Sequence, residues 1–198
     1  ASCLVGSEMC IRDSPSTHVI FEGLKKVKFN IDETHEPSPV LDYAKGKLES
    51  ENDLIKSNKN FVILRLGSLY GKSFDSTRLN IMPNLFAKIS SFNGKITLYS
   101  GGKQLKSLVS INDVVRCMEF VGENKKINKE IFNCVNENLS VKDVADLCKK
   151  INKKTDLVIT DDPVPNEGYT LTNKKIRSNG FKFLYLSLIH ISEPTRQE

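Results

Sequence analysis

The stretch F-V-I-L-R-L-G-S-L-Y-G, residues 61–71, decides the fold class of this chain. Its first six residues form an apolar run broken only by Arg65, which is typical of a strand buried on both faces inside a parallel sheet. Gly67 ends the run, and small or polar residues follow it. We therefore expect a buried strand over Phe61–Leu66 with candidate site residues directly after its carboxyl end.

Segments with the signals of strands and helices alternate on both sides of this run. Residues 16–21, which end in the apolar Val19-Ile20-Phe21, predict a short strand, and the charged segment 42–56 predicts a helix with Leu48, Leu54 and Ile55 as its main apolar contacts. Further helices are expected at 80–90, 112–121 (with Asp113 as N-cap), 140–151 and 173–178, and further strands at 96–99, 130–135 and 157–160. This order predicts an α/β fold with a parallel sheet.

The composition is that of a globular protein with one substantial core. The chain has 198 residues, of which 39% are hydrophobic and 27% charged, and no apolar run approaches the roughly 20 residues of a membrane span. Its net charge of +5 is spread over single lysines, which argues against nucleic acid and weakly favours anionic ligands. The five cysteines form no metal or disulfide pattern, so we predict a reducing cytoplasm, with core positions for Cys117, Cys134 and Cys148.

The two ends of the chain can be encoded by one DNA element in opposite orientations. Codons for L-S-L-I-H-I-S-E-P-T-R near the C-terminus, reverse-complemented and shifted in frame, translate as L-V-G-S-E-M-C-I-R-D near the N-terminus. The element resembles a transposon-end sequencing adapter. We therefore expect residues 1–13 and 186–198 to be non-native tails around a fragment of a longer protein.

Tyr43 and Lys47 lie four residues apart in the predicted helix 42–56, so both side chains point from one face, one turn apart. An ammonium beside a phenol favours the phenolate and lowers the pKa of a tyrosine from its usual value of about 10. Such a tyrosine can exchange a proton with an alcohol or ketone near neutral pH. Alone, this spacing arises often by chance, and the two residues are then ordinary surface side chains.

The segments around the pair carry further motifs in a characteristic order. S-T-H-V-I-F-E-G precedes it at residues 16–23, K-L-E-S-E continues it at 47–51, and R-L-G-S-L-Y-G follows at 65–71. G-G-K-Q-L-K-S-L-V-S-I-N-D-V-V comes later, at 101–115. Together these motifs resemble the extended short-chain dehydrogenase/reductases, the NAD-dependent epimerase/dehydratase family. The resemblance covers nearly all of residues 15–184 and looks closest to the dTDP-4-dehydrorhamnose reductase branch.

The resemblance implies an NAD(P)-dependent nucleotide-sugar epimerase or reductase with NAD or NADP as cofactor. Tyr43 would exchange the proton, Lys47 would tune it and hold the nicotinamide ribose, and Thr17 would orient the substrate oxygen. The cofactor would be lined by Gly67, Ser68 and Leu69. The nucleotide sugar would be contacted by Thr17, His18, Ser68 and Lys106, with Lys106 at its diphosphate. The implied fold is a Rossmann-type portion (14–71 and 109–136) with a substrate-binding portion (72–108 and 137–185) and a possible homodimer of the full-length protein.

Other features of the sequence leave alternatives open. No Gly-x-x-Gly-x-x-Gly turn occurs in the chain, and the resemblance places that turn in an N-terminal cofactor-binding half that we expect to be missing. The isolated chain is then expected to be inactive and prone to aggregation. His18 and Lys106 depart from the family pattern, which leaves room for a non-catalytic subunit. A third alternative is a member of the same superfamily that acts on a non-sugar alcohol or ketone. A dehydratase is disfavoured because Thr17 is not followed by Asp-Glu.

Two irregular segments, residues 72–106 and 161–172, separate the regular elements of the second portion. On α/β scaffolds, long irregular connections of this kind usually shape the ligand site. Each residue singled out also has an ordinary alternative role. Thr17 and Ser68 would then be strand residues, His18 a packed or loop-facing histidine, and Lys106 a surface lysine.

Overall fold

A three-stranded parallel sheet forms the centre of the first part of the fold, in the order β1 (Arg12–Thr17), β3 (Phe61–Leu66), β7 (Glu130–Cys134). The structure is a computed structural model that describes residues 12–71 and 78–185. β3 is the middle strand and its first five side chains are buried, because a central parallel strand is covered on both faces. The α/β fold with a parallel sheet is thereby confirmed, as is the strand predicted over Phe61–Leu66.

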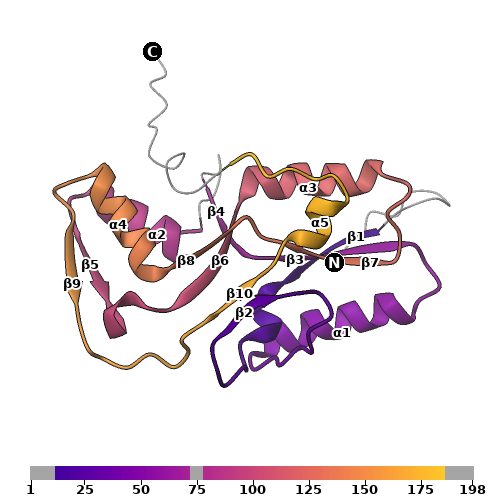
Figure 1. The fold of residues 1–198 in the computed structure, drawn as a ribbon, viewed down its shortest axis with the longest axis horizontal. Coiled ribbons are helices and arrows are strands. Elements are labelled where there is room, and N and C mark those ends of the chain that lie inside the picture. The colour runs from indigo at the N-terminus through magenta and orange to yellow at the C-terminus, as the bar shows by residue number, and fades with distance from the viewer. Residues whose placement is uncertain (1–11, 72–77, 186–198) are drawn as a thin grey trace, which may run out of the picture.

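Helices cover both faces of this sheet, as Figure 1 shows. α1 (Asp42–Lys56) lies on one face, while α3 (Ile111–Glu123) and the short α5 (Lys174–Ser178) lie on the other. The bounds of α1 match the predicted helix. The prediction that Ile55 is one of the main apolar contacts of this helix is wrong, because Ile55 is 49% exposed. The face of α1 toward the sheet is instead buried through Ala44 and Glu51.

A second group of elements extends from the carboxyl side of the sheet (Figure 1). β5 (Lys95–Leu98) pairs in parallel with β9 (Asp156–Ile159), and α2 (Met82–Ser91) packs with α4 (Val141–Ile151) beside them. The predicted capping box at the start of α4 is confirmed, with Ser140 and Asp143 exchanging hydrogen bonds. A mixed sheet joins the two groups: β4 (Ser68–Tyr70), β6 (Leu105–Ser110), β8 (Glu137–Ser140). A 3₁₀ turn, η2 (Tyr99–Gly102), follows β5.

The C-terminal part of the described chain returns to the first sheet. β10 (Tyr169–Leu171) pairs in parallel with β2 (Lys28–Ile31), and α5 then packs against β7. Ile176 and Phe181 join the apolar core between β3, β7 and α3. Residues that the sequence assigns to the substrate-binding portion thus contact the Rossmann-type portion, and they bring Tyr169 to the end of β1.

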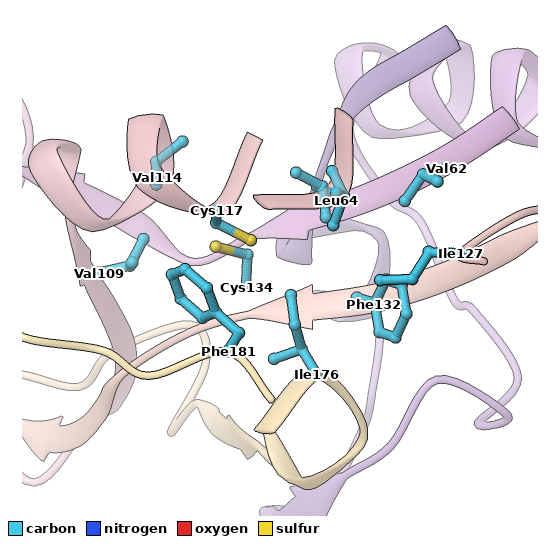
Figure 2. Packing of buried hydrophobic residues seen from close by; sticks show 11 residues of the cluster. Val62, Leu64, Val109, Val114, Cys117, Ile127, Phe132, Cys134, Ile176 and Phe181 are labelled. Carbon is cyan, nitrogen blue, oxygen red and sulfur yellow. The ribbon is translucent and has the colours of Figure 1, made fainter. Parts of the chain in front are cut away.

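Cys117 on α3 and Cys134 on β7 meet inside this core, and Figure 2 shows their sulfur atoms side by side. The thiol–thiol contact with Cys117, together with burial, raises the pKa of Cys134 well above its usual range. Cys148 lies in the second core with α2 and β5, where burial raises its pKa to about 11. All three predicted core cysteines are buried and reduced.

The strand predicted over residues 16–21 is wrong in its second half. β1 ends at Thr17, and His18–Phe21 form a 3₁₀ turn, η1. The Thr17 side chain accepts a hydrogen bond from the Val19 backbone N–H, which caps the turn. A short apolar run fits a buried turn as well as a strand, so its composition did not separate the two. β1 also begins earlier, since Arg12 and Asp13 of the expected N-terminal tail pair with β3.

The predicted N-cap of α3 is also wrong. Ser110 caps the helix by accepting from the Asn112 N–H, and Asp113 lies inside the first turn with no exposed surface. Its carboxylate accepts from the backbone N–H groups of Leu184 and Tyr185 and from Arg116. A buried carboxylate needs such partners, so Asp113 fastens the segment after α5 to α3.

Candidate functional site

The carboxyl ends of the three parallel strands lie level with one another. Thr17 of β1 is the register partner of Leu66 in β3, and Leu66 is the partner of Cys134 in β7. In open α/β sheets ligands bind outside this edge. The residues that follow the first two strands, His18 and Ser68, are therefore placed at the position where a site is expected.

Tyr43 stands at the start of α1, at the edge of the molecule. Its ring is 59% exposed, and among the described residues its hydroxyl has no hydrogen-bond partner. Lys47, one turn further along α1, is partly buried and donates from Nζ to the Pro15 carbonyl oxygen in β1 at 2.9 Å. The pair thus consists of an open phenol and an ammonium fixed to the strand that ends in Thr17.

A buried ion pair holds α1 in this orientation. Glu51 accepts from Arg65 Nη2 at 2.8 Å and from its Nε at 3.2 Å, and the two side chains are only 1% and 5% exposed. Arg65 also donates to the Glu33 carbonyl oxygen and lies over the Phe21 ring, 5.5 Å from its centroid. The arginine in the middle of the apolar run is therefore the anchor between β3 and α1.

His18 belongs to a buried group of polar side chains from three separate parts of the chain. Its Nδ1 lies 2.9 Å from the Tyr169 hydroxyl, and its Nε2 lies 3.2 Å from Ser68 Oγ. Tyr169 also donates its hydroxyl to the His18 carbonyl oxygen at 2.7 Å. Burial, and then the positive charge of Lys106, lower the pKa of His18 from 6.5 to about 4. The imidazole is therefore neutral at physiological pH.

Next to this group is a cavity of about 650 Å³ between the two parts of the fold, a typical size for a small-molecule site. His18 and Tyr169 line it, Lys106 of β6 contributes a positive charge, and Val40, three residues before Tyr43, also lines it. Both irregular segments supply lining residues, among them Asn80 and Gln104 from one and Asn166 from the other. Residues 72–77 lie outside the described part of the chain.

The structure brings together only some of the residues predicted from the sequence. His18 and Lys106 share the cavity, and Ser68 reaches it through His18. Gly67 is required by packing, since a Cβ there would lie 2.8 Å from the Ser107 carbonyl oxygen of β6. Leu69 packs against the apolar core of the first sheet.

Tyr169 is the residue that sequence reasoning missed. It is 151 residues from His18 in the chain, and it lies in no recognisable motif. Its position in the irregular segment 161–172 was the only available signal. Burial, with a smaller contribution from Glu22, raises the pKa of Tyr169, so it remains a protonated phenol.

The part of the chain that the structure describes has neither a cluster of metal-ligating side chains nor a membrane-spanning helix. No cluster of three or more His, Cys, Asp or Glu side chains that could hold a metal ion occurs there. None of the helices in this part is long and apolar enough to span a membrane.

Solved structures share this fold over most of the chain. A dTDP-glucose 4,6-dehydratase from Bacillus anthracis in complex with NAD is 16% identical, with a TM-score of 0.73, covering 87% of this chain and 56% of that one. A UDP-glucose 4-epimerase from Thermotoga maritima with UDP-glucose is 19% identical, with a TM-score of 0.70 and coverage of 84% and 55%. A UDP-glucuronic acid 4-epimerase from Bacillus cereus with UDP-glucuronic acid and NAD is 22% identical, with a TM-score of 0.69 and coverage of 84% and 54%.

At these identities the likeness establishes the fold alone, and the chain spans a little over half the length of the solved structures. No curated protein matches the sequence. A family model does match it, over residues 15–134, which is more than half of the 198 residues and includes Thr17, Tyr43, Lys47 and Ser68. The chain therefore belongs to the NAD dependent epimerase/dehydratase family.

Proposed function

We propose that the protein to which this chain belongs is an NAD(P)-dependent epimerase or reductase of nucleotide-linked sugars. The observation that carries the proposal is the state of the Tyr43–Lys47 pair. The phenol is exposed and has no partner among the described residues, while the ammonium one turn away is fixed to β1. A hydroxyl without a protein partner is available to a substrate, as that of a proton-transferring tyrosine must be.

The residues present fit the nicotinamide end of a dinucleotide. Lys47 has three N–H donors, and in the described part of the chain its one hydrogen bond is to the Pro15 carbonyl oxygen, so two remain for ribose hydroxyls. A bound NAD or NADP would supply the hydride acceptor or donor. The phosphates would need a glycine-rich turn, and the sequence holds none.

Each polar residue at the strand ends has a definite role in this proposal. Tyr43 exchanges a proton with the oxygen of the substrate's C–OH or C=O group. Thr17 Oγ accepts a hydrogen bond from the Val19 N–H, so its own hydroxyl proton is not used in that bond and can be donated to the same substrate oxygen. Lys47 places a fixed positive charge beside the phenol, where negative charge develops as Tyr43 gives up its proton.

The neighbouring cavity is where the nucleotide sugar would bind. Its volume of about 650 Å³ is large enough for a ligand of that size, and Lys106 supplies a positive charge for a diphosphate. A lysine offers a point charge without the paired donors of an arginine, so it tolerates more than one phosphate geometry. Among family activities, the sequence motifs favour a reductase of the dTDP-4-dehydrorhamnose type or an epimerase.

The test uses protein expressed from the complete reading frame that contains residues 14–185. It is assayed with UDP- and dTDP-linked sugars and 4-keto sugars, following nicotinamide absorbance for reduction and chromatography for epimerisation. Turnover with at least one nucleotide sugar supports the proposal. Cofactor binding without turnover of any sugar or ketone would instead assign the protein to the non-catalytic subunits, and turnover of simple ketones alone would remove the nucleotide sugar.

A further inference from the structure

Hydrogen bonds connect the side chains of His18, Ser68 and Tyr169. The position of each proton in this group follows from the number of hydrogen-bond donors and acceptors that each side chain has. A tyrosine hydroxyl has one proton to donate. In this structure that proton is directed to the His18 carbonyl oxygen at 2.7 Å. The 2.9 Å contact between the Tyr169 hydroxyl and His18 Nδ1 is then a hydrogen bond only if Nδ1 carries a proton.

The same reasoning gives the protonation state of the other ring nitrogen, Nε2. A neutral imidazole with its proton on Nδ1 has an unprotonated Nε2, which can only accept. Its neighbour at 3.2 Å is Ser68 Oγ, whose hydroxyl can donate. The opposite tautomer satisfies fewer contacts, because Tyr169 would then face an unprotonated Nδ1 with a single proton for two acceptors.

We propose that Tyr169 is a positioning residue: it holds His18 as the Nδ1–H tautomer, so that Ser68 donates to Nε2 and presents only lone pairs to a ligand. This assignment concerns the direction of every hydrogen bond in the group. Ser68 then accepts from a hydroxyl or amide N–H of the ligand and does not recognise a carbonyl or phosphate oxygen.

The remaining alternative, a doubly protonated His18 ring, is disfavoured by the surroundings of the ring. Burial, followed by the nearby Lys106, holds the pKa of His18 at about 4. Tyr169, from β10, and Ser68, from β4, are the side chains hydrogen-bonded to the ring, and neither supplies a negative charge to stabilise a cation. The pKa of Tyr169 is itself raised by burial, so its hydroxyl keeps the proton that the donor count requires.

What Ser68 would select in a ligand rests on the proposed function, because the proposed function makes the ligand group that contacts Ser68 a sugar hydroxyl. Ser68 follows the carboxyl end of β3, beside the end of β1 that carries Thr17. Thr17 has its proton available to donate, whereas Ser68 does not. The two hydroxyls would therefore distinguish a substrate oxygen that accepts from a neighbouring hydroxyl that donates.

The tautomer can be measured directly by NMR, without any ligand or cofactor, in protein expressed from the complete reading frame. Histidine ¹⁵N chemical shifts separate Nδ1–H, Nε2–H and doubly protonated rings. The signals that are lost in a His18→Gln variant are those of His18. At pH 7 we expect His18 to be the Nδ1–H tautomer. An Nε2–H or cationic His18 overturns the proposal.

Two variants test the role of Tyr169 itself. Tyr169→Phe keeps the ring and its edge contact with Phe21 but removes the acceptor of Nδ1–H, so the Nε2–H form should become populated. Tyr99→Phe is the matched control: Tyr99 lines the same cavity, and its substitution should leave the His18 signals unchanged. A tautomer that is unaltered in folded Tyr169→Phe contradicts the proposal.

Ser68→Ala covers the case in which Tyr169→Phe does not fold. It removes the donor to Nε2 and leaves Tyr169 in place, so His18 should remain Nδ1–H. A change to Nε2–H would show that Ser68, and not Tyr169, sets the tautomer, and would overturn the assignment. Because the tautomer is read without substrate, failure of the proposed sugar activity would not alter these results, and a wrong tautomer would leave that activity to be judged by its own assay.

Discussion

Two groups of polar side chains flank the carboxyl end of β1, and they differ in how many of their hydrogen bonds are already formed. Tyr43 and Lys47 of α1 form an open pair, with an exposed phenol and two ammonium N–H donors without partners in the described chain. His18, Ser68 and Tyr169 form a closed group in which each side chain has a partner inside the protein.

This difference separates side chains that transfer a proton to a substrate from side chains that orient their neighbours. A side chain that must move a proton to a substrate needs an unsatisfied hydrogen bond in the unliganded protein, and on the surface this costs little. A buried polar group must be satisfied at once, so it is suited to orienting its neighbours. The predictions below test this division, beginning with the largest expected effect.

Tyr43→Phe should lower kcat by about 10²–10⁴ in the protein from the complete reading frame, because the proton-transferring hydroxyl is removed. The KM for the nucleotide sugar should change little, since the ring remains. Lys45→Met, on the same helix two residues before Lys47, should retain activity and serves as control. Wild-type turnover by Tyr43→Phe would show that the open pair is an ordinary helix surface.

The open pair was predictable from the sequence because its information is local. Tyr43 and Lys47 are one helical turn apart, and helix 42–56 and strand 61–66 follow from periodicity and apolar runs. The closed group was not predictable. Tyr169 contacts His18 across 151 residues, and only the pairing of β10 with β2 brings them together.

The errors of the sequence analysis have the same origin. Val19, Ile20 and Phe21 are apolar whether they form a strand or a buried 3₁₀ turn, and the Thr17 cap decided in favour of the turn. Asp113 has the composition of an N-cap, but its partners are backbone N–H groups about 70 residues further along the chain. In each case a long-range or capping contact overrode a local preference.

Glu51→Gln tests what holds the open pair in place, and it should reduce the free energy of unfolding by about 3–5 kcal/mol. The substitution leaves Arg65 as a buried cation without its carboxylate, which is the costly way to break such a pair. Urea denaturation of the protein from the complete reading frame, followed by circular dichroism, gives the value. Glu49→Gln is the control, because Glu49 is exposed on the same helix and should have little effect.

The closed group predicts a pH-dependent loss of stability. The pKa of His18 is 6.5 when unfolded and about 4 when folded, so the unfolded chain binds the extra proton first as pH falls. The contribution is therefore fully present above pH 6.5 and is lost progressively toward pH 4, amounting to roughly 3 kcal/mol.

This contribution is isolated by comparing wild-type protein with His18→Asn, since carboxylates titrate over the same range in both. Lys106, the charge that faces the ring, is present in both proteins and does not alter the comparison. Urea denaturation at pH 7 and at pH 4 should show a loss larger by roughly 3 kcal/mol in the wild type. Parallel pH profiles would mean that His18 is solvated and that the group is not closed.

The smallest effect on stability is expected at the Asp42–Lys45 ion pair. It lies on the exposed side of α1, whereas Glu51 lies on the buried side of the same helix. The atoms of the Asp42–Lys45 pair approach to 3.0 Å, nearly as close as those of Glu51 and Arg65, but the side chains are 98% and 58% exposed. Water solvates both charges equally well when they separate, so proximity adds little. Asp42→Asn should leave the urea midpoint within experimental error. A loss comparable to that of Glu51→Gln would mean that this side of α1 is covered in solution, and Tyr43 would then no longer count as open.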